Sequence, residues 1–115
     1  MAIRSKLTVF RLVLPQIVIL DGGTTEVTTP TNVRGIIRTI VTTLNDNTNN
    51  VTATVTINDE DGAILSSTAA IPENAKTVTT GINAFCAGDL TIGVTPSADP
   101  GASTLTADIV LYGEK

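Results

Sequence analysis

Few residue types that carry out enzymatic chemistry occur in this chain, and histidine is absent altogether. Without an imidazole, the Ser/His/Asp and Cys/His nucleophile systems are excluded, as are zinc sites that need imidazole ligands. The single cysteine, Cys86, excludes both a multi-thiolate metal cluster and a disulfide within the chain. Because Cys86 lies between Phe85 and Ala87, we expect it to be a small core residue rather than a reactive thiol.

The carboxylates are spaced for turns rather than for a catalytic pair. A glycosidase needs two carboxylates in a cleft, which aromatic residues usually line. Five of the eleven acids stand instead in turn sequences, where a short side chain accepts hydrogen bonds from its own backbone. These turn acids are Asp21, Asp46, Asp59, Asp61 and Asp99. We therefore expect no enzymatic activity, no bound cofactor and no metal.

One acidic turn leaves an alternative open. Residues 58–62, Asn-Asp-Glu-Asp-Gly, gather several oxygen ligands and could bind calcium. The turn lacks the spaced ligand series of an EF-hand loop and a later bidentate glutamate. A solvated hairpin turn is the favoured interpretation. The alternative, a calcium-dependent β-domain, predicts a melting temperature that rises with calcium.

Aromatic side chains, on which sugars commonly stack, are scarce. Phe10 and Phe85 are flanked by apolar residues and are predicted to lie in the core. Tyr112 stands alone, on the opposite strand face from Leu111. A carbohydrate-binding or adhesive module is therefore the second function considered, and it predicts saturable glycan binding that is sensitive to Tyr112.

The composition indicates one folded, β-rich domain. The chain has 115 residues, of which 42% are hydrophobic and 16% charged, so it can bury a core and is not expected to be disordered. Abundant threonine suits a pleated surface, because its β-branched side chain is stiff. No clean helical spacing occurs, so the sequence predicts an all-β fold. No segment is long and apolar enough to span a bilayer.

The charge is unevenly distributed along the chain. The net charge of −4 argues against a general nucleic-acid binder. Residues 1–38 nevertheless hold five of the seven basic side chains and two of the eleven acids, for +3, whereas residues 39–115 carry −7. Either this is chance scatter, or a basic N-terminal segment lies on an acidic surface of a neighbouring subunit or partner.

The N-terminal segment consists of two extended apolar runs, 7–14 and 17–20, broken at Pro15. Arg11, Pro15 and Gln16 interrupt the apolar stretch, and no small-x-small site follows. We therefore interpret residues 1–20 as a retained arm rather than as a signal peptide. Apolar residues fall on both faces of the arm, and a sandwich of this size has little to cover both. The sequence thus predicts a homo-oligomer in which sister chains contact the arm.

Residues 21–115 are predicted to form a single β-sandwich domain. The clearest element is a hairpin over residues 51–67, where apolar residues alternate with threonines on either side of an Asp-Gly turn. Other strands are expected over residues 76–80, 89–95 and 103–112, with an irregular crossing over residues 81–88. About eight strands separated by turn signals favour an antiparallel, jelly-roll-like sandwich.

Two strands between the arm and the hairpin carry specific expectations. A short polar strand over residues 24–29 is expected to end at Pro30 and to lie at an edge of the sheet, because proline cannot donate to a central ladder. A longer strand over residues 35–44 is expected to place Ile36 and Ile40 on one face. Strict alternation then puts Ile37 and Val41 on the other.

The last quarter of the chain resembles a known group of proteins. It runs Asp89-Leu90-Thr91-Ile92-Gly93-Val94-Thr95-Pro96, then Asp99-Pro100-Gly101, then Ala107-Asp108-Ile109-Val110-Leu111-Tyr112. With a threonine-rich all-β chain of this length and an apolar arm, it resembles small jelly-roll proteins of tailed-phage virions, of the decoration, cementing or head-fibre type. The resemblance implies a virion location, a trimer that binds a capsid lattice, and no enzymatic activity.

We therefore expect a non-enzymatic structural protein that self-associates and binds a larger assembly such as a phage capsid. Neither nucleic acid nor a membrane is expected among its partners. Buried apolar area would supply affinity, and the charge asymmetry would supply orientation. The expected contacts between chains are the apolar and basic residues of the arm: Arg4, Lys6, Leu7, Val9, Phe10, Arg11, Leu12, Ile17 and Ile19. Deletion of residues 1–20 is expected to abolish oligomers.

Overall fold

The computed structural model describes residues 8–115, which form eight β-strands and no helix. The strands are β1 (Val9–Val13), β2 (Ile17–Ile19), β3 (Val27–Leu44), β4 (Ala53–Asp59), β5 (Ile64–Ile71), β6 (Ala75–Thr79), β7 (Ala84–Pro96) and β8 (Leu105–Glu114). All their pairings are antiparallel. In this part of the chain no helix could cross a membrane.

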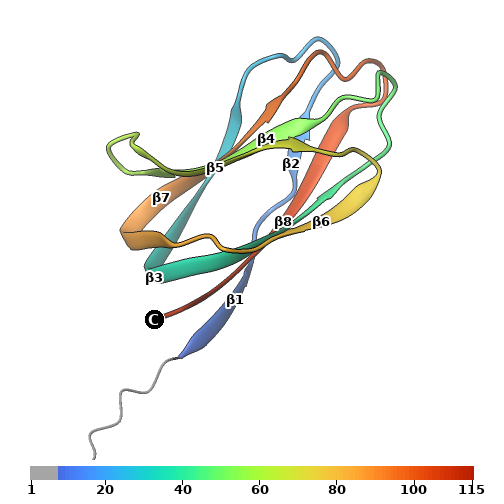
Figure 1. Cartoon of the computed structure of the whole chain (residues 1–115). Coiled ribbons are helices and arrows are strands. Elements are labelled where there is room, and N and C mark those ends of the chain that lie inside the picture. The colour runs from blue at the N-terminus through green and yellow to red at the C-terminus, as the bar shows by residue number, and fades with distance from the viewer. Residues whose placement is uncertain (1–7) are drawn as a thin grey trace, which may run out of the picture.

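The long strand β3 belongs to two layers. Residues 27–37 of β3 pair with β7, whereas residues 40–44 pair with β6 along the edge opposite β8. One layer therefore holds β5, β4, β7 and the first half of β3. The other holds β6, the second half of β3, β8, and β1 with β2. Figure 1 shows β3, in teal, turning from one layer into the other. The predicted all-β, jelly-roll-like antiparallel sandwich is confirmed.

Two glycines allow the backbones to approach closely where β3 turns. A Cβ atom at Gly35 would lie 2.5 Å from the carbonyl oxygen of Glu114 on β8. A Cβ atom at Gly113 would collide with the carbonyl oxygen of Ile36 and with the ring of Phe10. Any larger residue at these two positions would therefore push β8 away from the turn in β3.

A bulge at Arg38 corrects the predicted faces of β3. The register with β8 shifts between Ile37 and Thr39, so one extra residue interrupts the alternation. As a result Ile37 and Ile40 are both buried, whereas Ile36 lies on the outer side and is half-buried. The predicted grouping of Ile36 with Ile40 is wrong, because hydrophobic spacing does not reveal a bulge.

The predicted end of a strand at Pro30 is also wrong, since β3 continues through it to Leu44. Pro30 pairs with Thr91 of β7, but β8 joins the other edge of β3 only from Ile36 onward. At Pro30 the strand is therefore an edge strand, which tolerates a residue without an N–H donor.

The core lies between the two layers and draws on every strand except β1 and β6 for its fully buried side chains. Its largest fully buried side chains are Ile19, Ile37, Ile40, Leu44, Ile57, Ile71, Ile92, Leu105, Ile109 and Leu111. The predicted hairpin is confirmed as β4 and β5, and the strand after Ser103 is confirmed as β8. The predicted core position of Phe85 is wrong, because this side chain is 71% exposed.

Candidate docking surfaces

The first strand divides the predicted contact residues between two sides. Phe10 and Leu12 of β1 point inward, where they are half-buried and pack against the core. Val9 points outward and is 79% exposed, and Arg11 shares its side of the strand. The predicted contact residues Arg4, Lys6 and Leu7 lie outside the residues that the structure describes.

The second strand places two of its three side chains in the chain's own core. Ile17 and Ile19 pair with β8 through Ala107 and Leu105, and they are only 3% and 1% exposed. The predicted arm is therefore not one uniform contact surface. Ile17 and Ile19 of its second run are covered within the chain, whereas Val18 and Leu20 are 39% and 66% exposed. These two side chains and the outer side of β1 offer apolar atoms to another molecule.

Four valines form a row across the outer face of one layer. Val13 of β1 pairs with Val110 of β8, Val110 pairs with Val41 of β3, and Val41 pairs with Val78 of β6. Directly opposed residues of antiparallel strands have their side chains on the same face. Val13 and Val78 are 57% and 58% exposed, and the two central valines are half-buried. We call these four residues the valine row.

The outer face of the other layer carries a polar row across its four strands. There Thr28 pairs with Gly93, Gly93 with Thr56, and Thr56 with Ser67. The hydroxyl of Thr56 donates a hydrogen bond of 2.8 Å to the carboxylate of Glu26, which lies over Gly93. The sandwich thus has a hydroxyl-rich row on one outer face and an apolar row on the other.

A second exposed apolar surface lies where the two layers meet. Val9 pairs with Glu114, Glu114 with Ile36, and Ile36 with Phe85, so this row crosses from β1 through β8 and β3 to β7. Val9 and Phe85 are among the most exposed large hydrophobic side chains of the described residues. We call Val9, Ile36 and Phe85 the end patch.

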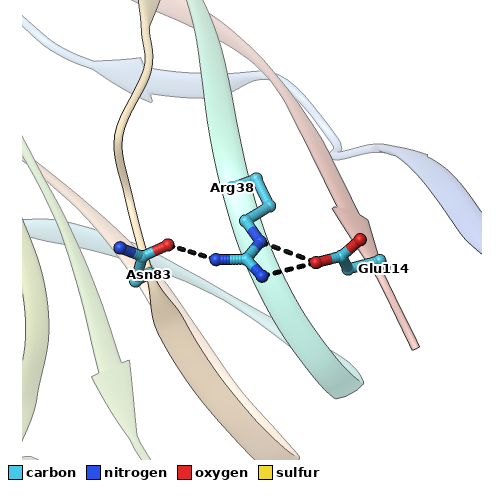
Figure 2. A network of polar contacts seen from close by, with 3 residues as sticks. All are labelled: Arg38, Asn83 and Glu114. Carbon is cyan, nitrogen blue, oxygen red and sulfur yellow. Dashed lines mark hydrogen bonds and ion pairs between the residues drawn. The ribbon is translucent and has the colours of Figure 1, made fainter. Parts of the chain in front are cut away.

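Arg38 fixes the polar margin of the end patch (Figure 2). Its guanidinium group donates to the carboxylate of Glu114 on β8 and to the side-chain carbonyl of Asn83, just before β7. The bulged strand is thereby tied to both of its neighbours. The side chain of Arg38 is 45% exposed, so water screens the ion pair and its contribution to stability is expected to be small.

A shallow groove with a basic rim lies between the layers beside β1. Phe10, Leu12 and Val33 supply its apolar wall, and Arg11, Arg34 and Lys115 supply positive charge. The accessible volume is about 240 Å³. Apart from Lys115, the residues that line this groove belong to the segment 1–38, which carries a net positive charge.

Arg11 is held on the outer face by its neighbour on β8. It donates a hydrogen bond of 3.1 Å from Nε to the hydroxyl of Tyr112, and its guanidinium carbon lies 6.0 Å from the centre of that ring. This contact positions a cation directly beside the valine row. Arg11 pairs with Tyr112, and these two residues lie two positions along their strands from Val13 and Val110. The predicted outward orientation of Tyr112 is confirmed.

The acidic turn of residues 58–62 has the geometry of a capped hairpin. The carboxylate of Asp59 accepts hydrogen bonds from the backbone N–H groups of Asp61 and Ala63, each 2.9 Å long. Its oxygen thus satisfies the backbone of its own turn. Among residues 8–115 no group of three acidic or sulfur side chains is arranged to hold a metal ion.

The single thiol is placed as predicted. Cys86 of β7 is buried, and its thiol donates to the carbonyl oxygen of Ala84. Burial raises the pKa of the Cys86 thiol, with a smaller opposing effect from a backbone hydrogen bond at Ile37. A raised pKa leaves little of the reactive thiolate at neutral pH.

Comparison with known proteins places the fold but not a family. No protein-family model matches the sequence, and no curated protein matches it either. The fold is similar to that of a chain in the structure of infectious bursal disease virus, Gx strain, with a TM-score of 0.54 and 12% identity over 96% of this chain. It is also similar to a chain in the crystal structure of the T13 viral particle of that virus, with a TM-score of 0.55 and 10% identity over 96% of this chain.

Both of these neighbours come from structures of a virus. The present chain spans about a third of their length, 32% of the first and 31% of the second. At this low identity the similarity establishes the β-sandwich fold and nothing further about the chain.

Proposed function

We propose that this protein is a non-enzymatic structural component of a virus particle, which associates with itself and docks on a larger protein shell. The observation that carries the proposal is the exposed apolar surface of the valine row and the end patch. A small sandwich that only had to remain monomeric in water would be expected to carry polar side chains on both outer faces, as the hydroxyl-rich layer does.

The capsid-like fold supports the particle as the setting. The same fold hosts unrelated functions in other proteins, so the setting rests on analogy and the docking rests on the surface itself. The absence of histidine from the sequence and the capped geometry of the acidic turn support a role without catalysis.

Within this proposal, a decoration or cementing role on a tailed-phage head is the specific form that the sequence resemblance favours. In that role the end patch would contact the shell, because Phe85 and Val9 project from the end of the sandwich where β1, β8, β3 and β7 come together. The basic rim of the neighbouring groove would orient the chain on an acidic shell.

The test is whether the chain travels with virus particles. Particles are purified by density gradient from a culture that expresses the full chain, and their protein content is measured by quantitative mass spectrometry. We expect the chain in the particle fractions at a constant ratio to the shell protein. Recovery only in the unassembled fractions would overturn the proposal.

Two variants sharpen this test. Phe85→Asp places a charge in the end patch and is expected to reduce the copies per particle at least several-fold. Ser67→Asp places the same charge on the exposed, hydroxyl-rich face and should leave the copies per particle unchanged. A glycan-array signal for a chain that is missing from particles would favour the carbohydrate-binding alternative instead.

A further inference from the structure

The valine row is an unusual feature for a sheet that faces water. Antiparallel sheets with one solvated face alternate apolar residues inward with polar residues outward. Here the outward position of four neighbouring strands is valine in a single transverse row, while the opposite layer uses threonine, glycine and serine. The row extends over the full width of the layer, from the edge strand β1 to the edge strand β6.

The shape of the row fits another sheet rather than a loop or a helix. Valine is branched at Cβ, so a line of valines forms a low ridge with few side-chain rotamers to restrict. Two sheets pack face to face at about 10 Å, with side chains of the two faces interdigitating. A flat partner carrying the same ridge would cover all four valines at once.

The charges beside the row identify the partner. On one side, a step of two residues along the strands, lies Arg11 of β1. On the other side of the row lies Asp108, two residues before Val110 on β8. Asp108 is exposed and accepts a 3.2 Å hydrogen bond from Gln16. Within the described residues neither Arg11 nor Asp108 forms an ion pair with another side chain.

A twofold axis along the row brings these two charges together. Rotation by 180° about that axis places the Arg11 side of one copy over the Asp108 side of the other, and the valines over the valines. The contact is then isologous, so it contains the Arg11–Asp108 pair twice. Lys76, which pairs with Thr43 at the far edge of the layer, stays away from Arg11 in this arrangement.

We propose that two copies of this chain pack face to face across the valine row, with Arg11 of each copy paired to Asp108 of the other. This inference rests on the proposed self-association and gives it a surface. Because a twofold contact joins copies in pairs, it predicts an even number of chains where the phage-protein resemblance implies three.

Sedimentation velocity of the full chain tests the apolar part of the contact. Val13→Asp and Val78→Asp change exposed positions on opposite edges of the layer, and each is expected to weaken the dimer at least tenfold. Ser67→Asp on the other face is the matched control and should sediment as the wild type does. Circular dichroism and thermal melting verify that each variant remains folded. A folded Val78→Asp variant with the wild-type mass would overturn the proposal.

A charge exchange tests the geometry of the contact. Arg11→Glu alone and Asp108→Arg alone each place like charges together twice and are expected to be largely monomeric at low salt. An equal mixture of these two variants restores both opposite-charge pairs in the mixed dimer, so dimers should reappear. A mixture that stays monomeric would rule out the twofold arrangement.

The two proposals fail separately. If the chain is found on particles but Val78→Asp does not change its mass, the dimer is wrong and the structural role is kept. If the dimer and the charge exchange behave as expected but the chain is missing from particles, the structural role is wrong and the contact is kept.

Discussion

The carboxylate of Asp99 links loops that are distant in sequence. It accepts hydrogen bonds from the backbone N–H groups of Gly22 and Gly101, at 2.8 and 2.9 Å, and its own carbonyl oxygen accepts from Asn49. The hydrogen bond from Gly101, followed by that from Gly22, lowers the pKa of Asp99 below its usual value of 3.8. The side chain of Asp99 therefore connects the turn after β2 with the loop before β8, and its backbone carbonyl adds the loop before β4.

This pKa shift predicts a pH dependence for Asp99→Asn. The native state favours the carboxylate, so the contribution of Asp99 to stability is present above pH 3.8 and is lost as the pH falls through the lowered native pKa. At pH 7 the variant should melt below the wild type, and the gap should close on acidification below about pH 4. Melting curves from pH 7 to 2 provide the measurement. A gap that stayed constant over this range would contradict the assignment.

At the level of the strands, the turn in β3 decides which residues become surface. The bulge at Arg38 reverses the alternation, so that Ile36 and Val41 face outward although both are apolar. Without the bulge, strict alternation would put Ile36 and Val41 on opposite faces, so either the end patch or the valine row would lose a central residue. The docking surfaces therefore follow from one irregularity in one strand.

A glycine substitution tests how closely β8 packs against this turn. Alanine at Gly113 would collide with the carbonyl oxygen of Ile36, and such overpacking is expected to cost about 1–3 kcal/mol and to lower the melting temperature by several degrees. The control is Gly62→Ala in the β4–β5 turn, where a Cβ atom would meet nothing within 4 Å. Its positive φ of 85° should cost only about 1 kcal/mol.

Thermal melting compares the two variants. If Gly113→Ala proved no more destabilising than Gly62→Ala, the backbones of β3 and β8 would have to lie farther apart than described.

Alternation and turn chemistry were sufficient to predict the class of fold, the β4–β5 hairpin and the last strand, β8. They failed where one strand belongs to two layers. β3 continues through Pro30 because its other edge is unpaired there, and no local pattern shows that the strand continues. The valine row was equally inaccessible, since its members are separated by between 28 and 37 residues in the order Val13, Val41, Val78 and Val110. Only the strand register brings them together.

Phe85 illustrates the same limit for the site. Its apolar flanks predicted a core position, but Ala84 and Cys86 take the inward positions of β7 and leave Phe85 outside. Likewise, the doubly apolar arm is divided by the fold: Val9 and Val13 of β1 are exposed, while Ile17 and Ile19 are in the core of the same chain. Deletion of residues 1–20 would remove that part of the core, so point substitutions on the outer face are the better test.

At the scale of the whole molecule, the two outer faces differ in what they offer to a partner. The layer of β3, β7, β4 and β5 presents hydroxyl groups, whereas the layer of β6, β3, β8 and β1 presents the valine row between Arg11 and Asp108. A molecule with one apolar face can bury it by pairing and still expose the end patch, which lies along β1 beyond the row. Pairing and docking on a shell are therefore compatible.

The native mass of the full chain, measured by size-exclusion chromatography with light scattering at low and high salt, tests this account most directly. The account predicts twice the 11.9 kDa of one chain, or a larger even multiple, at both salt concentrations. The mass should persist at high salt, because salt screens the Arg11–Asp108 pairs and leaves the apolar contact in place. A monomer at both salt concentrations would contradict the account, because the valine row would then face water without a partner.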